Sequence, residues 1–248
     1  MRKTFKYILN LLLVLTTIFI FSVIILNTVY SEKIKQRLIT EIKTHVDTNM
    51  NPSNIEFSIW GDFPYASIKF YNLLIYESPE FNNDSLLYAK EAVVSFSILD
   101  ILKDKYNINN LYLSEGNINI KYNEYNKNNF SIFKNNTGEN NIFVEKIILN
   151  NCSLSYKKIT PQINIDWNIS QAIIELNNED VILNSVLFSK KLEINQIEYL
   201  ENKECTISTI FNTIKDSIKI DKSVISIGNV TTNVDGYITN GNNLDLNI

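Results

Sequence analysis

From residue 54 onward, apolar and polar residues alternate with a period of two. The clearest runs are residues 55–60, 118–122 and 163–169, in which Ile, Phe, Tyr or Trp occupies every second position. Because successive side chains of a β-strand point to opposite faces of the sheet, this pattern predicts strands with one apolar face and one solvated face. Such strands are typical of antiparallel sheets. The pattern therefore predicts a mainly β domain over residues 51–248.

Asn-rich segments divide the rest of this region into similar short units. Asn tolerates the left-handed conformation of tight turns, so these segments predict turns, among them Asn109-Asn110 and Asn150-Asn151. The segment 123–141 is polar and rich in Asn and Lys, and it predicts a flexible insertion or a boundary. Further strands are expected at residues 66–76, 86–97, 108–113, 143–149, 153–158, 172–176, 181–188, 192–199, 206–211, 217–220, 224–227, 231–238 and 244–248, and a short helix at residues 97–105.

The first thirty residues differ from the rest, because residues 7–31 carry no charge and are mostly apolar. About 20 residues of helix cross a hydrocarbon core of ~30 Å, so this stretch is long enough for a transmembrane helix. A cleaved signal peptide is the competing interpretation, but its apolar part would be shorter, and the end of this run is a poor cleavage site. We therefore expect an uncleaved anchor over residues 1–31, with a short cytoplasmic tail.

Residues 32–50 show a helical period, since apolar residues recur every four positions from Ile34 to Val46 and charged residues fill the other face. This predicts a juxtamembrane amphipathic helix that lies along the membrane or packs on the sheet. Basic residues flank the anchor on both sides, so the positive-inside rule does not decide its orientation. A short tail followed by a long domain fits a signal anchor, which would place residues 51–248 outside the cytoplasm.

Composition narrows the possible chemistry. The 248-residue chain has 23 Lys and Arg against 27 Asp and Glu, which leaves no basic excess for binding nucleic acid. One His and two Cys exclude most zinc sites, and no phosphate-binding loop, dinucleotide-binding fingerprint or Ser-His-Asp arrangement is present. We therefore expect no enzymatic activity, no catalytic or metal-binding residues and no cofactor. Cys152 and Cys205 either form a disulfide in an oxidising compartment or remain separate buried thiols.

Three segments follow one another after the anchor and the helix: residues 55–68 (IEFSIWGDFPYASI), 86–102 (LLYAKEAVVSFSILDIL) and 106–120 (YNINNLYLSEGNINI). In this order they resemble the N-terminal part of AsmA-like proteins, which are anchored in the bacterial inner membrane, face the periplasm and are related to bridge-like lipid transfer proteins. The resemblance covers roughly the first 135 residues well and the remainder in pattern only. Members of that family are usually much longer, so the resemblance implies a truncated or partial chain.

The resemblance implies a non-enzymatic role in outer-membrane biogenesis or in phospholipid transport, and location in the inner membrane with the large domain in the periplasm. It implies an elongated, twisted antiparallel sheet curled into a groove with an apolar lining. The implied partners are membrane lipids and envelope assembly proteins. The residues that we expect to line such a groove are Ile118, Ile120, Ile163, Ile165 and Trp167.

Alternation alone does not distinguish an open groove from a closed β core, because both bury one apolar face of each strand. The alternative function is an exported structural or interaction module, such as a β-sandwich scaffold or an adhesin, that transfers no lipid. An anchored hydrolase would need converging carboxylates, and the sequence indicates no such cluster.

Overall fold

The computed structural model of the chain describes residues 7, 10, 12–18, 32, 35, 36, 39, 40, 48–58, 65–81, 84–101, 103, 107–132, 144–177, 180–214, 217–239 and 244–247. Residues 12–18 are helical. Over the described residues, no helix combines the length and the apolar character that are needed to cross a bilayer. The predicted anchor, residues 1–31, and the predicted amphipathic helix, residues 32–50, lie mostly outside the described residues.

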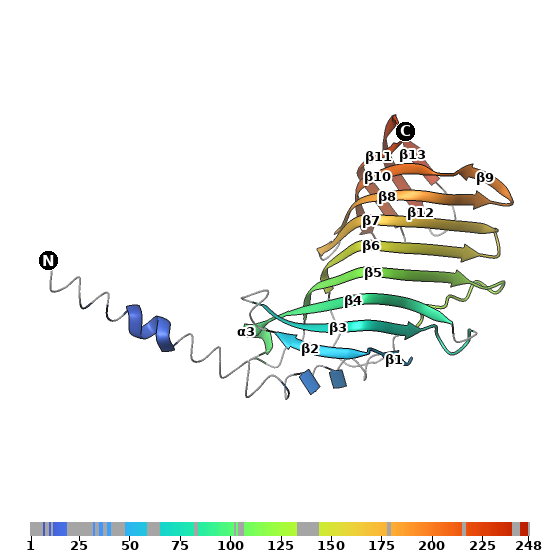
Figure 1. The fold of residues 1–248 in the computed structure, drawn as a ribbon. Helices are drawn as coiled ribbons and strands as arrows, with labels where there is room; N and C mark the ends of the chain where they lie inside the picture. The colour runs from blue at the N-terminus through green and yellow to red at the C-terminus, as the bar shows by residue number, and fades with distance from the viewer. Residues whose placement is uncertain are drawn as a thin grey trace.

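The described part of the chain is mainly β, as predicted, and its strands form one wide sheet (Figure 1). The elements are β1 (Met50–Asn51), β2 (Asn54–Ser58), β3 (Tyr65–Tyr76), β4 (Ser85–Ser97), α3 (Ile98–Ile101), β5 (Ile108–Tyr122), β6 (Val144–Lys158), β7 (Ile163–Asn177), β8 (Asp180–Ile194), β9 (Ile197–Leu200), β10 (Lys203–Ile214), β11 (Ser217–Ile227), β12 (Val230–Thr239) and β13 (Leu244–Asn247). The short helix expected at residues 97–105 corresponds to α3.

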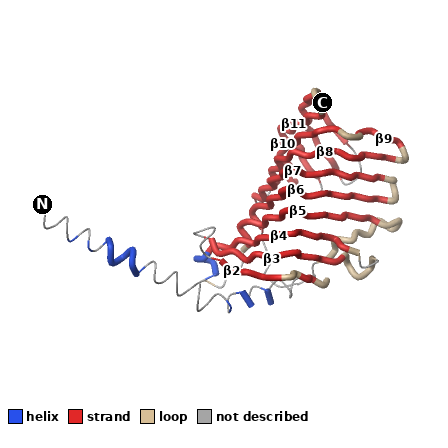
Figure 2. The backbone as a smooth tube through the Cα atoms, viewed as in Figure 1, coloured by secondary structure: helices blue, strands red, loops and turns tan. Residues whose placement is uncertain are grey.

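Strand order follows the chain almost throughout. The order is β1-β3-β4-β5-β6-β7-β8-β10-β11-β12-β13, with β2 also paired to β3 and β9 also paired to β8. The two ends of this path do not pair with each other, so the sheet is not closed into a barrel within the described residues. Figure 2 shows the long strands stacked side by side and turning partway along their length instead of running straight.

The prediction of an antiparallel sheet is wrong at one pair of strands, because β5 and β6 are parallel and the sheet is therefore mixed. Parallel neighbours need a crossover of about a dozen residues or more, and the connection over residues 123–143 is long enough to provide one. Within the segment expected to be a flexible insertion or a boundary, Asn129 is fully buried and hydrogen-bonded to β5. Residues 133–143 lie outside the described residues.

Five adjacent strands, β3 to β7, each contain one exposed residue at which the pairing with a neighbour is interrupted. These residues are Asn72, Lys90, Glu115, Asn151 and Ser170, and we call them the kink row. Three of them, Asn72, Glu115 and Asn151, have φ between 47° and 51°. A left-handed residue inside a strand shifts the alternation by one, so that apolar residues before and after it can share a face. The turn predicted at Asn150-Asn151 is therefore wrong, because Asn151 is a kink inside a continuous strand.

The shift in alternation is clearest in β5. Leu111 and Leu113 occupy odd positions before Glu115, whereas Ile118 and Ile120 occupy even positions after it. Register and burial place all four on the same face of the sheet, which we call the inner face, and the opposite face is the outer face. The buried hydrophobic cluster of the inner face comprises Ile68, Phe70, Leu73, Ala89, Ala92, Val94, Phe96, Leu113, Leu149, Cys152, Ile169, Ala172, Leu187 and Cys205.

Candidate functional site

The five residues predicted to line a groove lie together on the inner face, on one side of the kink row. Ile118 and Ile120 belong to β5, and Ile163, Ile165 and Trp167 belong to β7. Only β6 separates the two strands in the sheet. The side chains of all five are partly buried, so each contacts its neighbours and still has accessible surface.

Two residues of β6 join these positions and were not predicted as part of the site. Leu154 lies opposite both Ile118 and Trp167, and Tyr156 lies opposite both Ile120 and Ile165. The alternation of residues 153–158 predicted a strand with these two side chains on its apolar face. The sequence gives no sign, however, that this strand would pair with both β5 and β7. On the far side of β7, the register adds Leu192 opposite Ile165.

Buried residues flank the kink row on the inner face. The flanking pairs are Phe70 and Leu73, Ala89 and Ala92, Leu113 and Gly116, Leu149 and Cys152, and Ile169 and Ala172. Several are small, and Gly116 has no side chain. A Cβ on Gly116 would lie 2.5 Å from the backbone oxygen of Tyr88, so the backbones of β4 and β5 approach closely there. Small residues at this line allow the strands to turn without a clash on the inner side.

The inner face becomes more polar toward β8, β10 and β11. The buried residues there include Ser185, Ser189, Thr209 and Ser223. The hydroxyls of Thr209 and Ser223 bond to each other, and Ser189 Oγ donates to the Leu200 carbonyl at 3.4 Å. Ser185 Oγ is buried and has no partner among the described residues. The predominantly apolar part of the inner face therefore extends from β3 to β8.

The two cysteines lie in one row of the inner face and do not form a disulfide. The register runs from Cys152 to Ile169, then to Leu187 and then to Cys205, on four successive strands. Three strand spacings of about 4.8 Å separate the two Cα atoms by roughly 14 Å, twice the greatest distance that a disulfide spans. Both thiols are free and buried, and burial raises the pKa of Cys205.

A buried polar cluster lies where β3 and β5 end. Glu77 is 2% exposed, and its Oε1 accepts hydrogen bonds from Lys121 Nζ at 2.7 Å and from Asn129 Nδ2 at 2.9 Å. Lys121 also forms an ion pair with Asp84 at 2.9 Å. Although desolvation lowers it, the pKa of Lys121 is raised overall by its bonds to Glu77 and Asp84. The cluster ties the β3–β4 connection to the crossover after β5.

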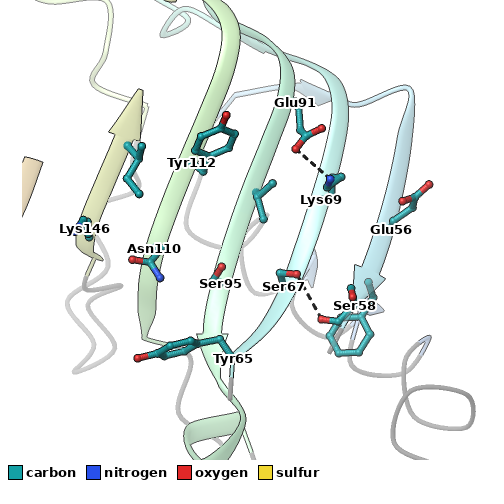
Figure 3. Close-up of a pocket in the computed structure, with 13 residues that line it drawn as sticks. Glu56, Ser58, Tyr65, Ser67, Lys69, Glu91, Ser95, Asn110, Tyr112 and Lys146 are labelled. Atoms are coloured by element: carbon teal, nitrogen blue, oxygen red, sulfur yellow. Dashed lines mark hydrogen bonds and ion pairs between the residues drawn. The ribbon is translucent and has the colours of Figure 1, made fainter. Parts of the chain in front are cut away.

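The outer face carries a hollow of about 750 Å³ over β2 to β6, lined by both polar and apolar side chains (Figure 3). Its charged side chains have partners: Lys69 pairs with Glu91 at 3.1 Å, and Lys146 pairs with Glu175 at 2.8 Å. The hydrogen bond that Lys69 donates to Glu91 raises the pKa of Lys69. Sequence reasoning missed this site, because it treated the polar positions of each strand only as a solvated face.

Side chains of the kinds that bind metals do not cluster on either face of the described sheet. Within the described ranges, no group of three or more His, Cys, Asp or Glu converges as metal ligands do. No profile of a known protein family matches the sequence, and no curated protein is significantly similar to it.

Proposed function

We propose that the chain is a membrane-anchored, periplasmic protein of the AsmA-like type, whose inner face forms an apolar groove for the acyl chains of membrane lipids. In this role it acts in outer-membrane biogenesis or in phospholipid transport and performs no chemistry. The observation that carries the proposal is the inner face itself. The inner face is apolar from β3 to β8, and the five residues expected to line a groove, on one side of the kink row, remain partly accessible. The described residues provide no second sheet that covers this face.

The energy of such binding is sufficient without a polar anchor. Each buried CH₂ group contributes about 0.8 kcal/mol, so an acyl chain of about 16 carbons would gain on the order of 10 kcal/mol. The aliphatic side chains of Ile118, Ile120, Ile163 and Ile165 offer such contacts without specific geometry. A chain held this way can slide along the strands, because every new contact resembles the one that it replaces.

The predicted anchor would hold this groove at the surface of the inner membrane. Residues 7–31 would span the membrane and residues 32–50 would lie at its periplasmic surface, next to the first strands of the sheet. A protease-accessibility assay on intact and permeabilised spheroplasts tests this arrangement. We expect cleavage of the β domain from the periplasmic side, and cleavage from the cytoplasmic side alone would reverse the orientation.

Site-specific photo-crosslinking tests the groove directly. A photoreactive amino acid placed at Ile118, Ile120, Ile163, Ile165 or Trp167 of the full chain should form adducts with phospholipid in bacteria that have an inner and an outer membrane. The matched controls are Asn119 and Asn164, which neighbour these positions in sequence and lie on the outer face. We expect lipid adducts at the inner positions only. Adducts with protein alone at the inner positions would favour the structural or interaction module instead.

A further inference from the structure

The outer-face hollow is built from side chains that lie in straight rows across five strands. One row, which we call the polar row, consists of Ser58, Ser67, Ser95, Asn110 and Lys146, one residue from each of β2 to β6. The next row consists of Glu56, Lys69, Val93, Tyr112 and Ile148, again in register. Because neighbouring strands lie about 4.8 Å apart, the polar row presents a hydrogen-bonding group at regular intervals.

Several groups in this hollow have unused hydrogen-bonding capacity. Ser95 is 5% exposed, lines the hollow and makes no hydrogen bond to any described residue. The Ser95 hydroxyl is therefore free to bond a ligand in the hollow. The side-chain amide of Asn110 and the hydroxyl of Tyr65, which also line the hollow, make no hydrogen bond to the described residues either. Figure 3 shows these three side chains at the same end of the hollow.

The charges in the hollow do not favour an ionic ligand. Lys69 and Lys146 are balanced by Glu56 and Glu91 in the lining, and both lysines already have a carboxylate partner. Glu56 accepts a hydrogen bond from the Tyr71 hydroxyl at 3.1 Å. An anion would have to displace Glu91 or Glu175 from its lysine and leave a carboxylate without its partner, which is costly. A cation would meet a single carboxylate outside an ion pair, Glu56, whose oxygens already accept hydrogen bonds from Tyr71 and Asn54. A neutral ligand rich in hydroxyls would instead satisfy the unpaired groups.

We propose that this hollow binds a neutral oligosaccharide in an extended conformation, along the polar row. The strand spacing is close to the length of one sugar ring in an extended chain, so successive sugars would meet Ser67, Ser95 and Asn110 in turn. The rings of Tyr65 and Tyr112 offer apolar surfaces next to polar groups, which suits the C–H faces of sugars. The site lies on the opposite face from the proposed lipid groove and does not depend on it.

Glycan binding by the purified full chain tests this proposal. The chain, in a detergent that contains no sugar, is applied to an array of neutral and acidic oligosaccharides, and the strongest neutral binder is titrated by calorimetry. We expect binding to neutral members of the array. Ser95→Ala and Asn110→Ala should each weaken it about tenfold, as the loss of one buried hydrogen bond predicts. The matched control is Asn168→Ala, since Asn168 is an outer-face residue of β7 away from the hollow.

Two readouts separate this proposal from effects on folding and from the lipid groove. Thermal unfolding shows whether each variant is folded, and lipid photo-crosslinking at Ile165 should be unchanged in Asn110→Ala. The proposal is overturned when no neutral oligosaccharide binds, when only acidic oligosaccharides bind, or when folded Ser95→Ala and Asn110→Ala bind as well as Asn168→Ala does.

Discussion

Gly116 is the residue on which the turn of the sheet depends most directly. It follows Glu115 of the kink row, and its missing Cβ would lie 2.5 Å from the backbone oxygen of Tyr88 and 3.3 Å from the Cα of Ala89. Both of these atoms belong to the backbone of β4, which cannot rotate away as a side chain could. Nothing in the alternation of the sequence marks this glycine, because its role arises from a strand that is distant in the chain.

Gly116→Ala should therefore destabilise the fold by about 2 kcal/mol, the cost typical of overpacking at a site that relaxes poorly. A lower urea midpoint with an unchanged slope measures the effect. Asn117→Ala, at the next position on the exposed outer face, serves as the control and should change stability by less than about 0.5 kcal/mol. Equal midpoints for Gly116→Ala and the unsubstituted chain would show that β4 and β5 are farther apart than described.

The two thiols should remain reduced even in an oxidising compartment, because roughly 14 Å separates Cys152 from Cys205. Alkylation without reductant, followed by mass spectrometry, should label neither cysteine in the folded protein and both in urea. Burial raises the pKa of Cys205, so its thiol is protonated at neutral pH and its labelling should be slow. A species two mass units lighter that gains two labels only after reduction would contradict this register.

At the scale of elements, the sequence predicted the positions of the strands well and their continuity poorly. Residues 108–113 and 118–122 are halves of β5, and residues 143–149 and 153–158 correspond to halves of β6. The alternation of apolar and polar residues changes phase at Glu115 and at Asn151. Because Asn residues lie at or next to both positions, each change of phase looks like a turn in the sequence. The five residues expected to line a groove still share one face, because that expectation relied on alternation within each half; that they line a groove stays a prediction.

The parallel pairing of β5 with β6 could not be predicted, because it depends on the crossover and on contacts far apart in sequence. Asn129 fixes the start of that crossover: its side chain accepts a hydrogen bond from the Lys121 amide at 2.8 Å and donates to Glu77 and to the Asn119 carbonyl. Backbone hydrogen bonds from the Asn129 amide to the Lys121 carbonyl and from the Asn123 amide to the Lys127 carbonyl hold the same turn.

Asn129→Ala should lower the free energy of unfolding by about 3 kcal/mol, since it removes one of the two hydrogen bonds to the buried Glu77 carboxylate and the side-chain partner of two backbone groups. Hydrogen exchange should also become faster at Ser78 and Lys121, whose amides bond to Asn129. Asn168→Ala, on the outer face of β7, is the control. Stability equal to that of the control would mean that the crossover does not need this cluster.

The described strands form a single open sheet with two chemically different faces. Its continuous path of eleven strands extends over roughly 50 Å at about 4.8 Å per interval, which exceeds the ~30 Å hydrocarbon core of one bilayer. The predominantly apolar part of the inner face, from β3 to β8, extends over five of these intervals, roughly 24 Å. Spanning the space between two membranes would need additional length from further chain, a partner or oligomers.

The difference between the faces leads to a prediction for the whole protein. Ile165→Glu places a carboxylate among Tyr156, Leu192 and other inner-face residues, where it disfavours acyl chains because an unpaired charge next to hydrocarbon is costly. Asn164→Glu places the same charge one residue away on the outer face. Phospholipid that co-purifies with the full chain, quantified by mass spectrometry, should fall severalfold in Ile165→Glu and stay unchanged in Asn164→Glu. Because Ile165 is only partly buried, both variants should fold, as circular dichroism can verify. Equal lipid content in the two folded variants would show that the inner face is not where lipid binds.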